Sequence, residues 1–272
     1  MIEKPRLSKS ATVDKRVRLR RARSADAKAI FGIIKENFPL RFLACSTFGY
    51  PGGARQLAEE LSLSPELQEP VRRVATADGA VVGYIDLKSA GDTLFLSYIA
   101  VARRYQGQHL GSRLLALALK EARTPESEHL ALDVLSENEP AKKWYHRLGL
   151  VESGRTRWVL HDLKSAAGTP MGRVIGFAAA QAAQERYGFS EFSVQTATGV
   201  RRVGRLGRTL FRVADRLGLD PELVSTLRHL DPKRRILELQ NASTDDVAAT
   251  DEHLAADTLR LKAPIAIVLE RL

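Results

Sequence analysis

The sequence is poor in cysteine and has no long apolar run, and both absences limit what the protein can be. Its 272 residues include a single cysteine, Cys45, so an intrachain disulfide framework is excluded. No apolar stretch approaches the length of a membrane-spanning helix, and the first residues lack the apolar core of a secretory signal. We therefore expect a soluble, cytoplasmic protein that has no membrane partner.

Acidic and aromatic residues are also in short supply. The 32 acidic residues do not balance the 42 basic ones, and the formal net charge of +10 suits an anionic partner. The basic excess gathers in residues 1–23 and 201–235, whereas 245–257 is acidic. A nucleic-acid site would interleave aromatic side chains for base stacking, but only Phe211 lies within the second basic segment. A nucleic-acid partner therefore stays open but is less favoured than a solvated basic face.

Residues 101–115, VARRYQGQHLGSRLL, are the most informative stretch of the chain. They follow an apolar run typical of a strand, over 94–101, and lead into a run typical of a helix that ends near Ala122. The turn between them carries Gly107 and Gly111. Glycine lets the backbone approach a phosphate closely, and the unpaired N–H groups of a first helical turn donate to it. This geometry is suited to pyrophosphate binding.

The stretch resembles the acetyl-CoA signature of the GCN5-related N-acetyltransferase (GNAT) family, Q/R-x-x-G-x-G/A, which follows a strand ending in valine. Gln106 fills the first position of this signature and Gly111 the last, whereas His109 replaces the middle glycine. A Cβ atom is tolerable there if the local φ is negative. We therefore expect a pyrophosphate loop that is weakened but not excluded.

Two other segments continue the resemblance. HLALDVLSENEPAKKWYHRLGL, over 129–150, is similar to the family's fifth strand and following helix, with Asn138, Ala141 and Tyr145 in the matching places. VRLRRARSADAKAIFGII, over 17–34, is similar to the opening strand and helix. Together the blocks cover roughly residues 15–164 and imply an N-acetyltransferase domain.

The expected elements belong to the α/β (α+β) class. Alternating runs predict strands on both sides of Asp78-Gly79, which is a strong hairpin signal. With the resemblance, they imply the GNAT fold, a mixed and mostly antiparallel sheet flanked by helices on both faces. We expect three parts along the chain: a basic flexible arm over 1–14, the acetyltransferase domain over 15–164, and a smaller C-terminal α/β unit over 170–272.

The C-terminal unit contains a segment that aligns with the signature without a gap. LSYIAVARRYQGQHLG (96–111) aligns with FSVQTATGVRRVGRLG (192–207), which puts Gly207 at the place of Gly111. The alignment predicts a strand, a turn and a helix across 192–217. We interpret 170–272 as a degenerate second GNAT-like unit that buttresses the first or makes a homodimer, and coincidence in an Ala-, Arg- and Leu-rich chain is the alternative.

The resemblance implies acetyl-CoA as co-substrate and no metal. In the family, the backbone at the end of the fourth strand bonds the pantetheine and thioester, and the loop after it holds the pyrophosphate. The implied contacts are Ile99, Ala100, Val101, Gln106, Gly107, Gln108, His109, Leu110, Gly111, Ser112 and Tyr145. Asn138 either caps the following helix or bonds the pantetheine amides.

Acyl transfer to an amine needs a group that accepts the ammonium proton and an acid for the departing thiolate. Tyr145 corresponds to the tyrosine that supplies this acid in the family, and an ordinary packed tyrosine is the alternative. The candidates for the base are Asp86, Asp133 and Tyr98, and solvent water is the remaining option.

The acceptor is not identified by the sequence. In the family, the region between the first two helices shapes the acceptor pocket, so Phe38, Phe42, Phe48 and Tyr50 are candidate substrate contacts or else pack a loop onto the sheet. A metabolite amine or an acidic peptide segment fits the basic surface better than a polycation. The alternative function is a non-catalytic acyl-CoA-binding or regulatory protein whose basic C-terminal half contacts nucleic acid.

Overall fold

The computed structural model describes residues 17–163, 170–214, 219–242 and 254–272, and within them a single sheet runs through the chain. Its 12 strands follow the order β1-β2-β3-β4-β5-β12-β6-β11-β10-β9-β8-β7. The first half supplies β1 (Arg18–Arg21), β2 (Val71–Ala77), β3 (Ala80–Ala90), β4 (Thr93–Val101), β5 (His129–Leu135) and β6 (Val151–Asp162). The second half supplies β7 (Arg173–Ile175), β8 (Phe189–Thr196), β9 (Gly199–Leu206), β10 (Leu210–Val213), β11 (Arg235–Ala242) and β12 (Leu254–Pro264). The arm predicted over 1–14 lies outside the described residues.

Helices flank this sheet, and most strand pairs are antiparallel, so the predicted fold class is confirmed. The parallel pairs are β4 with β5 and β10 with β11. The helices are α1 (Ala27–Asn37), α2 (Leu40–Ala44), α3 (Gly52–Glu60), α4 (Leu110–Ala122), α5 (Glu139–Arg147), α6 (Phe177–Tyr187), α7 (Pro221–Leu230) and α8 (Ile265–Glu270). In the described part of the chain, no helix is long and apolar enough to cross a membrane.

Apolar side chains at helical spacing attach the helices to the two faces of the first half. In α1, Ile30 and Ile34 are fully buried against β2 and β3. In α4, Leu114, Leu115 and Leu119 are fully buried on the opposite face, in a cluster that also includes residues of α5 and α8. Such i, i+1 and i+4 or i+5 positions form one stripe of a helix. The site described below lies at the edge between these two packed faces.

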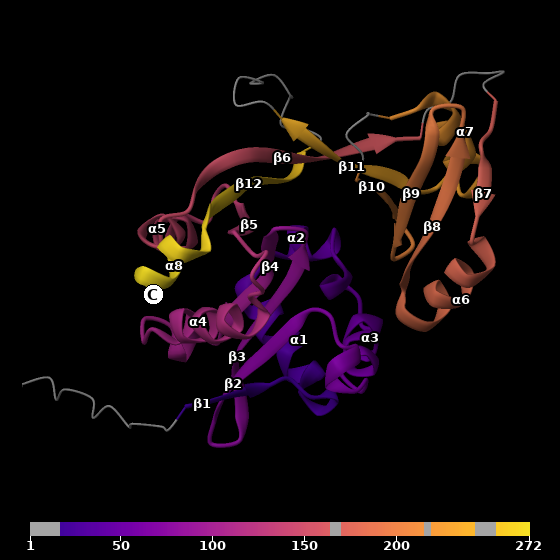
Figure 1. The fold of residues 1–272 in the computed structure, drawn as a ribbon. Helices are drawn as coiled ribbons and strands as arrows, with labels where there is room; N and C mark the ends of the chain where they lie inside the picture. The colour runs from indigo at the N-terminus through magenta and orange to yellow at the C-terminus, as the bar shows by residue number, and fades with distance from the viewer. Residues whose placement is uncertain (1–16, 164–169, 215–218, 243–253) are drawn as a thin grey trace, which may run out of the picture.

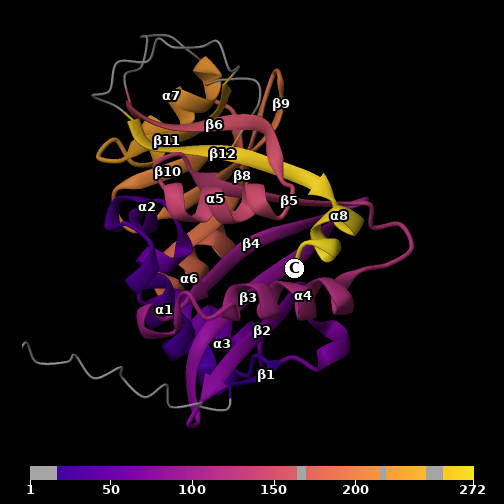
Figure 2. The same ribbon diagram turned by 90° about the vertical axis from the view of Figure 1, so that its left-hand side faces the viewer.

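The two halves exchange their last strands. β12, which ends the second half, lies between β5 and β6, and β6 pairs on its other side with β11. β6 and β12 run side by side across the molecule in both views (Figure 1, Figure 2). The fifth strand of each half, β5 or β11, therefore pairs along its edge with a strand from the other half. As a result the sheet is continuous between the two halves.

The second half repeats the topology of the first half. The segments that correspond in the two halves differ from those that the gapless sequence alignment matched. The order β7-β8-β9-β10-α7-β11-β12 follows β1-β2-β3-β4-α4-β5-β6, and in both the fourth and fifth strands are parallel. The prediction of a strand, turn and helix across 192–217 is wrong, because 192–207 falls in the hairpin of β8 and β9. Gly207 has φ of +53° and serves the turn before β10 rather than a helix N-terminus.

Candidate active site

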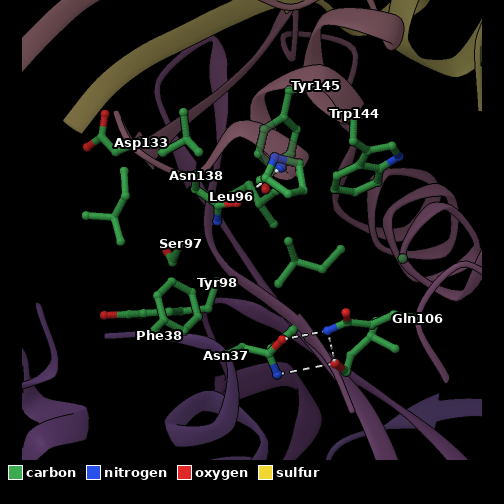
Figure 3. Close-up of a pocket in the computed structure, with 18 of the residues that line it drawn as sticks. Asn37, Phe38, Leu96, Ser97, Tyr98, Gln106, Asp133, Asn138, Trp144 and Tyr145 are labelled. Atoms are coloured by element: carbon green, nitrogen blue, oxygen red, sulfur yellow. Dashed lines mark hydrogen bonds between the residues drawn. The ribbon is translucent and has the colours of Figure 1, made fainter. Parts of the chain in front are cut away.

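The parallel strands β4 and β5 separate halfway along their length. They pair from Thr93 and His129 as far as Leu96 and Leu132. At this point β4 carries a bulge at Ser97, since Leu96 is opposite Leu87 whereas Tyr98 is opposite Asp86. A bulge bends its strand and interrupts the ladder. A cavity of about 920 Å³ opens where the strands part (Figure 3).

The splayed edge of β4 leaves backbone groups facing this cavity. The Ala102 N–H donates to the Val82 carbonyl of β3 at 2.9 Å, so Ala100, two residues away, also bonds β3. Successive residues of a strand direct their backbone groups to opposite sides. Ile99 and Val101 therefore point towards the β5 side. All three predicted contacts line the cavity, but only Ile99 and Val101 turn their backbone groups to the β5 side, whereas Ala100 bonds β3.

The Gln106 side chain bonds back to α1 and β4 and holds the loop in place. Its Nε2 atom donates to the Asn37 Oδ1 atom at 2.8 Å and to the Val101 carbonyl oxygen at 3.0 Å (Figure 3). Asn37 Nδ2 donates to the same carbonyl at 3.2 Å. Gln106 thus joins the end of α1, the end of β4 and the start of the loop. Asn37 was not identified from the sequence.

The N-terminus of α4 presents unpaired amides to the cavity. Its first helical bond runs from the Arg113 N–H to the His109 carbonyl at 3.0 Å. The amides of Leu110, Gly111 and Ser112 precede that bond and have no partner within the helix. All three residues line the cavity. They can donate to a phosphate group there, and the helix dipole favours its negative charge.

His109 adopts a backbone conformation that differs from the expected one. Its φ is +55° and its ψ is 15°, in the left-handed region, so the condition of a negative φ is not met. The family signature has glycine at this position, and a side chain here costs about 1–2 kcal/mol. The loop keeps the turn that the signature requires, at the expense of local strain.

Positive charge collects at this end of the cavity. Arg103 and Arg147 line it. Arg103 is tied to Glu36, with 3.8 Å between its Nε atom and Oε1, whereas Arg147 makes no hydrogen bond or ion pair within the described residues. Gln108 is not among the lining residues; its side chain donates to the Arg104 carbonyl at 3.1 Å. Gln108, one of the predicted cofactor contacts, is therefore bonded within the loop and does not line the cavity.

Tyr145 and Asn138 lie on α5 and at its start, on the opposite wall from β4 (Figure 3). Asn138 Oδ1 accepts from the Ala141 N–H at 3.2 Å, which confirms the predicted cap. Tyr145 is buried, and its ring centroid is 4.8 Å from that of Trp144. Burial raises the pKa of the Tyr145 phenol above its ordinary value. Its hydroxyl has no hydrogen-bond partner in the described part of the chain.

Asp86 is not in the cavity, so its prediction as a candidate base is corrected. Its carboxylate is buried and accepts from Arg72 Nε and from the Tyr84 hydroxyl, both at 3.0 Å. Arg72 also donates to Glu60 at 2.6 Å. Asp86 is thus one member of a structural ion-pair cluster beneath α3.

Tyr98 and Asp133 do line the cavity, at the end away from Gln106 (Figure 3). Burial raises the pKa of Tyr98 to about 12, and a hydrogen bond with Ser46 offsets part of that rise. A phenol with such a pKa carries its proton at neutral pH. The Asp133 carboxylate is held by the Arg260 guanidinium, whose Nη2 atom donates to Oδ2 at 2.9 Å.

Aromatic side chains form the wall of the cavity near Tyr98. The Phe38 ring centroid is 5.9 Å from that of Tyr98 and 5.5 Å from that of Phe42. Phe42 is in turn 5.2 Å from Trp158 of β6. These contacts fall in the range of favourable aromatic pairs. The predicted contacts Phe38 and Phe42 therefore lie in the cavity wall.

Phe48 and Tyr50 lie elsewhere, which corrects the other half of that prediction. Phe48 is buried behind Tyr98, with 4.5 Å between the ring centroids. Tyr50 packs against the second half, 6.4 Å from the Phe189 ring, and its hydroxyl donates to the Ala44 carbonyl at 2.7 Å. These two aromatic residues fix the loop after α2 and its contact with the second half.

The comparison with protein families agrees with this geometry. Residues 40–150 match the model of the Acetyltransferase (GNAT) family. This segment is a GNAT domain. It includes the splayed strands, the loop before α4, and α5.

Similar proteins are known for this GNAT domain and for the fold of the whole chain. A Bacillus subtilis (strain 168) protein, named as a candidate ribosomal protein bS18-alanine N-acetyltransferase, is 30% identical over 81 residues. The match covers 30% of this chain and 54% of that protein, so the chain spans about half the length of this curated relative.

Two solved structures are similar over nearly the full chain. A GCN5-related N-acetyltransferase from Sphaerobacter thermophilus has a TM-score of 0.60 at 14% identity, covering 93% of this chain and 97% of that one. A tandem GNAT protein from the clavulanic acid biosynthesis pathway has a TM-score of 0.59 at 15% identity, covering 91% and 98%. At these identities the likeness shows the fold alone, and that fold includes the second half.

The second half contributes directly to the cavity of the GNAT domain. Thr258 of the exchanged strand β12 lines it beside Trp158. Neither residue, nor Trp144, was predicted from the sequence to lie at the site. Trp144 could have been found from its position next to Tyr145 in the sequence. Trp158 and Thr258 could not, because they are 100 residues apart and meet through the pairing of β6 with β12.

Proposed function

We propose that the protein transfers an acetyl group from acetyl-CoA to a primary amine by direct attack of the amine on the thioester. The observation that carries this proposal is the cavity between β4 and β5, which joins the N-terminus of α4 to Tyr145 and to an aromatic wall. Membership of residues 40–150 in the GNAT family supports the same reaction class.

The residues that line the cavity fit acetyl-CoA along its length. The amides of Leu110, Gly111 and Ser112, with Arg147 beside them, would hold the pyrophosphate. The free backbone edge at Ile99 would pair with the pantetheine amides as an added strand does. The thioester would then lie near the bulge, between β4 and α5.

The bond changes follow from this placement. The amine nitrogen attacks the thioester carbonyl carbon, and a backbone N–H of the splayed edge stabilises the oxygen of the tetrahedral intermediate. The C–S bond then breaks, and the thiolate takes the proton of the Tyr145 hydroxyl. Because burial raises the pKa of that phenol, the proton is in place at neutral pH.

The amine must lose a proton, since an alkylamine with a pKa of about 10.4 is charged at neutral pH. Tyr98 is a poor acceptor for it, because a pKa of about 12 keeps its hydroxyl protonated. Asp133 is the predicted carboxylate that lines the cavity. We assign the proton transfer to a water relay beginning at Asp133, whose carboxylate Arg260 holds in place.

Calorimetric titration with acetyl-CoA tests this proposal first. We expect micromolar binding that Gly111→Trp abolishes, because a Cβ at residue 111 already lies 3.7 Å from the Trp144 ring and a larger group would collide with it. Gly32→Trp is the matched control, since a Cβ at this exposed position on α1 meets nothing within 4 Å. Thiol release with a panel of amines then measures transfer. Equal binding by both variants would contradict the assigned cofactor site.

A further inference from the structure

Two basic side chains from different strands converge on one aromatic ring at the acceptor end of the cavity. The Lys88 Nζ atom of β3 lies 5.3 Å from the centroid of the Phe95 ring of β4, and the Arg260 guanidinium carbon of β12 lies 5.0 Å from it. Lys88 is directly opposite Phe95, and Arg260 is directly opposite Asp133 of β5. Phe95 pairs with Ala131 of β5, so Asp133 and Arg260 lie two residues further along the sheet than Lys88 and Phe95. Cation–π attraction to the Phe95 ring draws both basic side chains together.

The charges of Lys88, Arg260 and Asp133 do not cancel. Arg260 makes a two-point ion pair with Asp133, which leaves its Nη1 group without a hydrogen bond to any described residue. Lys88 is exposed and has neither a hydrogen bond nor an ion pair among the residues that the structure describes. Two cations thus share one carboxylate. The excess positive charge attracts an anion to this end of the cavity.

Both cations are accessible from the acceptor side. Lys88, Phe95 and Asp133 line the main cavity. Arg260 and Asp133 line a second cavity of about 460 Å³, which adjoins the first at Asp133, Trp158 and Thr258. A space of this size suits a small molecule. An acceptor can therefore extend from the thioester past the aromatic wall to Lys88 and Arg260.

The sheet also sets the length of that acceptor. Phe95 precedes Ser97 by two residues and Ile99 by four, and the thioester lies along that edge under the proposed function. At about 3.3 Å per residue, the anion site is about 7–13 Å from the reacting amine. We propose that the acceptor is a small ω-amino acid whose carboxylate binds Lys88 and Arg260 while its amine reaches the thioester. This inference rests on the proposed function.

Paired substrates of equal chain length test the carboxylate requirement. Acetylation rates are measured with ε-aminocaproate and with hexylamine, which lacks the carboxylate. We expect a lower KM for ε-aminocaproate in the unmodified protein. Lys88→Gln should raise that KM about fivefold, as expected for one partly exposed ion pair, and leave the KM for hexylamine unchanged. Lys120→Gln, at an exposed position on α4, is the matched control and should change neither value.

The outcomes separate this inference from the proposed function. Equal KM values for the two amines, or equal effects of the two lysine variants, would overturn the carboxylate site while acetyl transfer stands. If acetyl-CoA binds but neither amine is acetylated, the carboxylate site is tested directly by calorimetric titration of the CoA-loaded protein with ε-aminocaproate. Binding that Lys88→Gln weakens supports the site, and absence of binding overturns it. Failure of acetyl-CoA to bind contradicts the proposed function. Titration of the protein alone with ε-aminocaproate then tests the carboxylate site by the same criterion.

Discussion

The Trp158 indole N–H of β6 donates to the Thr258 hydroxyl of β12 at 3.4 Å, so the two exchanged strands meet at the wall of the candidate active site. Thr258 in turn donates to the Thr156 carbonyl at 3.3 Å. The second half is therefore more than an appended unit. It supplies the strand against which an aromatic residue of the acceptor wall is held.

Removing the Trp158 side chain should impair acceptor binding and leave cofactor binding intact. Trp158→Ala removes one side of the aromatic wall, and we expect KM for the acceptor to rise about tenfold, the equivalent of one lost aromatic contact. The acetyl-CoA dissociation constant should not change, because the pyrophosphate loop is at the other end of the cavity. Thr258→Val keeps the shape of its side chain and should have a much smaller effect. Steady-state kinetics measure KM for the acceptor, and calorimetry measures the acetyl-CoA dissociation constant. A parallel loss of both affinities would contradict the placement of Trp158 in the acceptor wall.

Replacing His109 by glycine should relieve backbone strain. At φ of +55° the histidine occupies a region in which glycine carries no penalty. After the greater chain entropy of glycine is subtracted, we expect His109→Gly to raise the free energy of unfolding by about 0.5–1 kcal/mol. Urea unfolding measures this gain.

Gly107→Ala is the converse variant for the same loop. Gly107 has φ of +73°, and a Cβ there meets nothing within 4 Å, so its cost is one of backbone conformation alone. It should lower the free energy of unfolding by about 1 kcal/mol. A stability loss in His109→Gly would show that the His109 side chain makes contacts worth more than the strain.

Much of this loop could be predicted because its signals are local. A strand, two glycines and a helix start occur within residues 94–111, and each constrains its neighbours directly. Asn138 as a helix cap has the same origin, since the accepting oxygen and the Ala141 amide are three residues apart. The left-handed backbone at His109 could not be foreseen, because it depends on how the loop joins α4.

Other errors came from long-range structure. Asp86 and Asp133 are similar in sequence context, but the bulge at Ser97 and the Arg72 cluster separate them in space. The gapless alignment matched the hairpin of β8 and β9 to the motif of β4 and α4, because Gly207 imitates a motif glycine. Strand exchange leaves no local signal at all, so Thr258 could be found only from the pairing of β12.

Tyr145→Phe should reduce kcat and leave acetyl-CoA binding unchanged. The phenol proton is lost while the ring packing is kept, and removal of a general acid lowers kcat about a hundredfold or more. Because the pKa of Tyr145 is raised above its usual value near 10, the unmodified protein should show no loss of activity from this group up to about pH 10. Tyr50→Phe, whose hydroxyl bonds Ala44 outside the cavity, is the control. A pH-rate profile of each variant checks this, and an unchanged kcat would exclude Tyr145 as the acid.

The second half should bind no acetyl-CoA of its own. The helix α7 stands where α4 stands in the first half, but carboxylates already occupy its N-terminus. Asp220 accepts from the Glu222 amide and from the Thr196 hydroxyl, both at 2.8 Å, and Glu222 accepts from the Ala197 amide at 2.9 Å. Hydrogen bonds from threonine hydroxyls and backbone amides outweigh burial and lower the Asp220 pKa, so the group is an anion that repels phosphate. Calorimetry should give one acetyl-CoA per chain, all of it lost in Gly111→Trp. Residual binding in that variant would reveal a second site.

The ion pair between Arg20 and Asp26 should make stability depend on pH at the start of α1. Burial opposes ionisation of Asp26, but hydrogen bonds from Arg20 at 2.6 and 2.8 Å and from the Arg23 amide at 2.8 Å outweigh it and lower the Asp26 pKa. A carboxyl whose folded pKa is depressed stabilises the fold above its unfolded pKa of about 3.9, and this contribution is lost as the pH falls through the lower folded value.

Asp26→Asn should therefore lower the free energy of unfolding by about 1.5–3 kcal/mol at pH 7, the range of a hydrogen bond to a charged group. The difference from the unmodified protein should shrink steadily below pH 4, because protonation removes the same charge from the unmodified chain. Arg20→Gln should give a similar loss at pH 7, and the double variant should lose less than the sum of the two, since the residues act on each other. Urea unfolding at pH 7 and pH 3 measures all three, and a difference that does not vary with pH would show that Asp26 acts through packing and not through its charge.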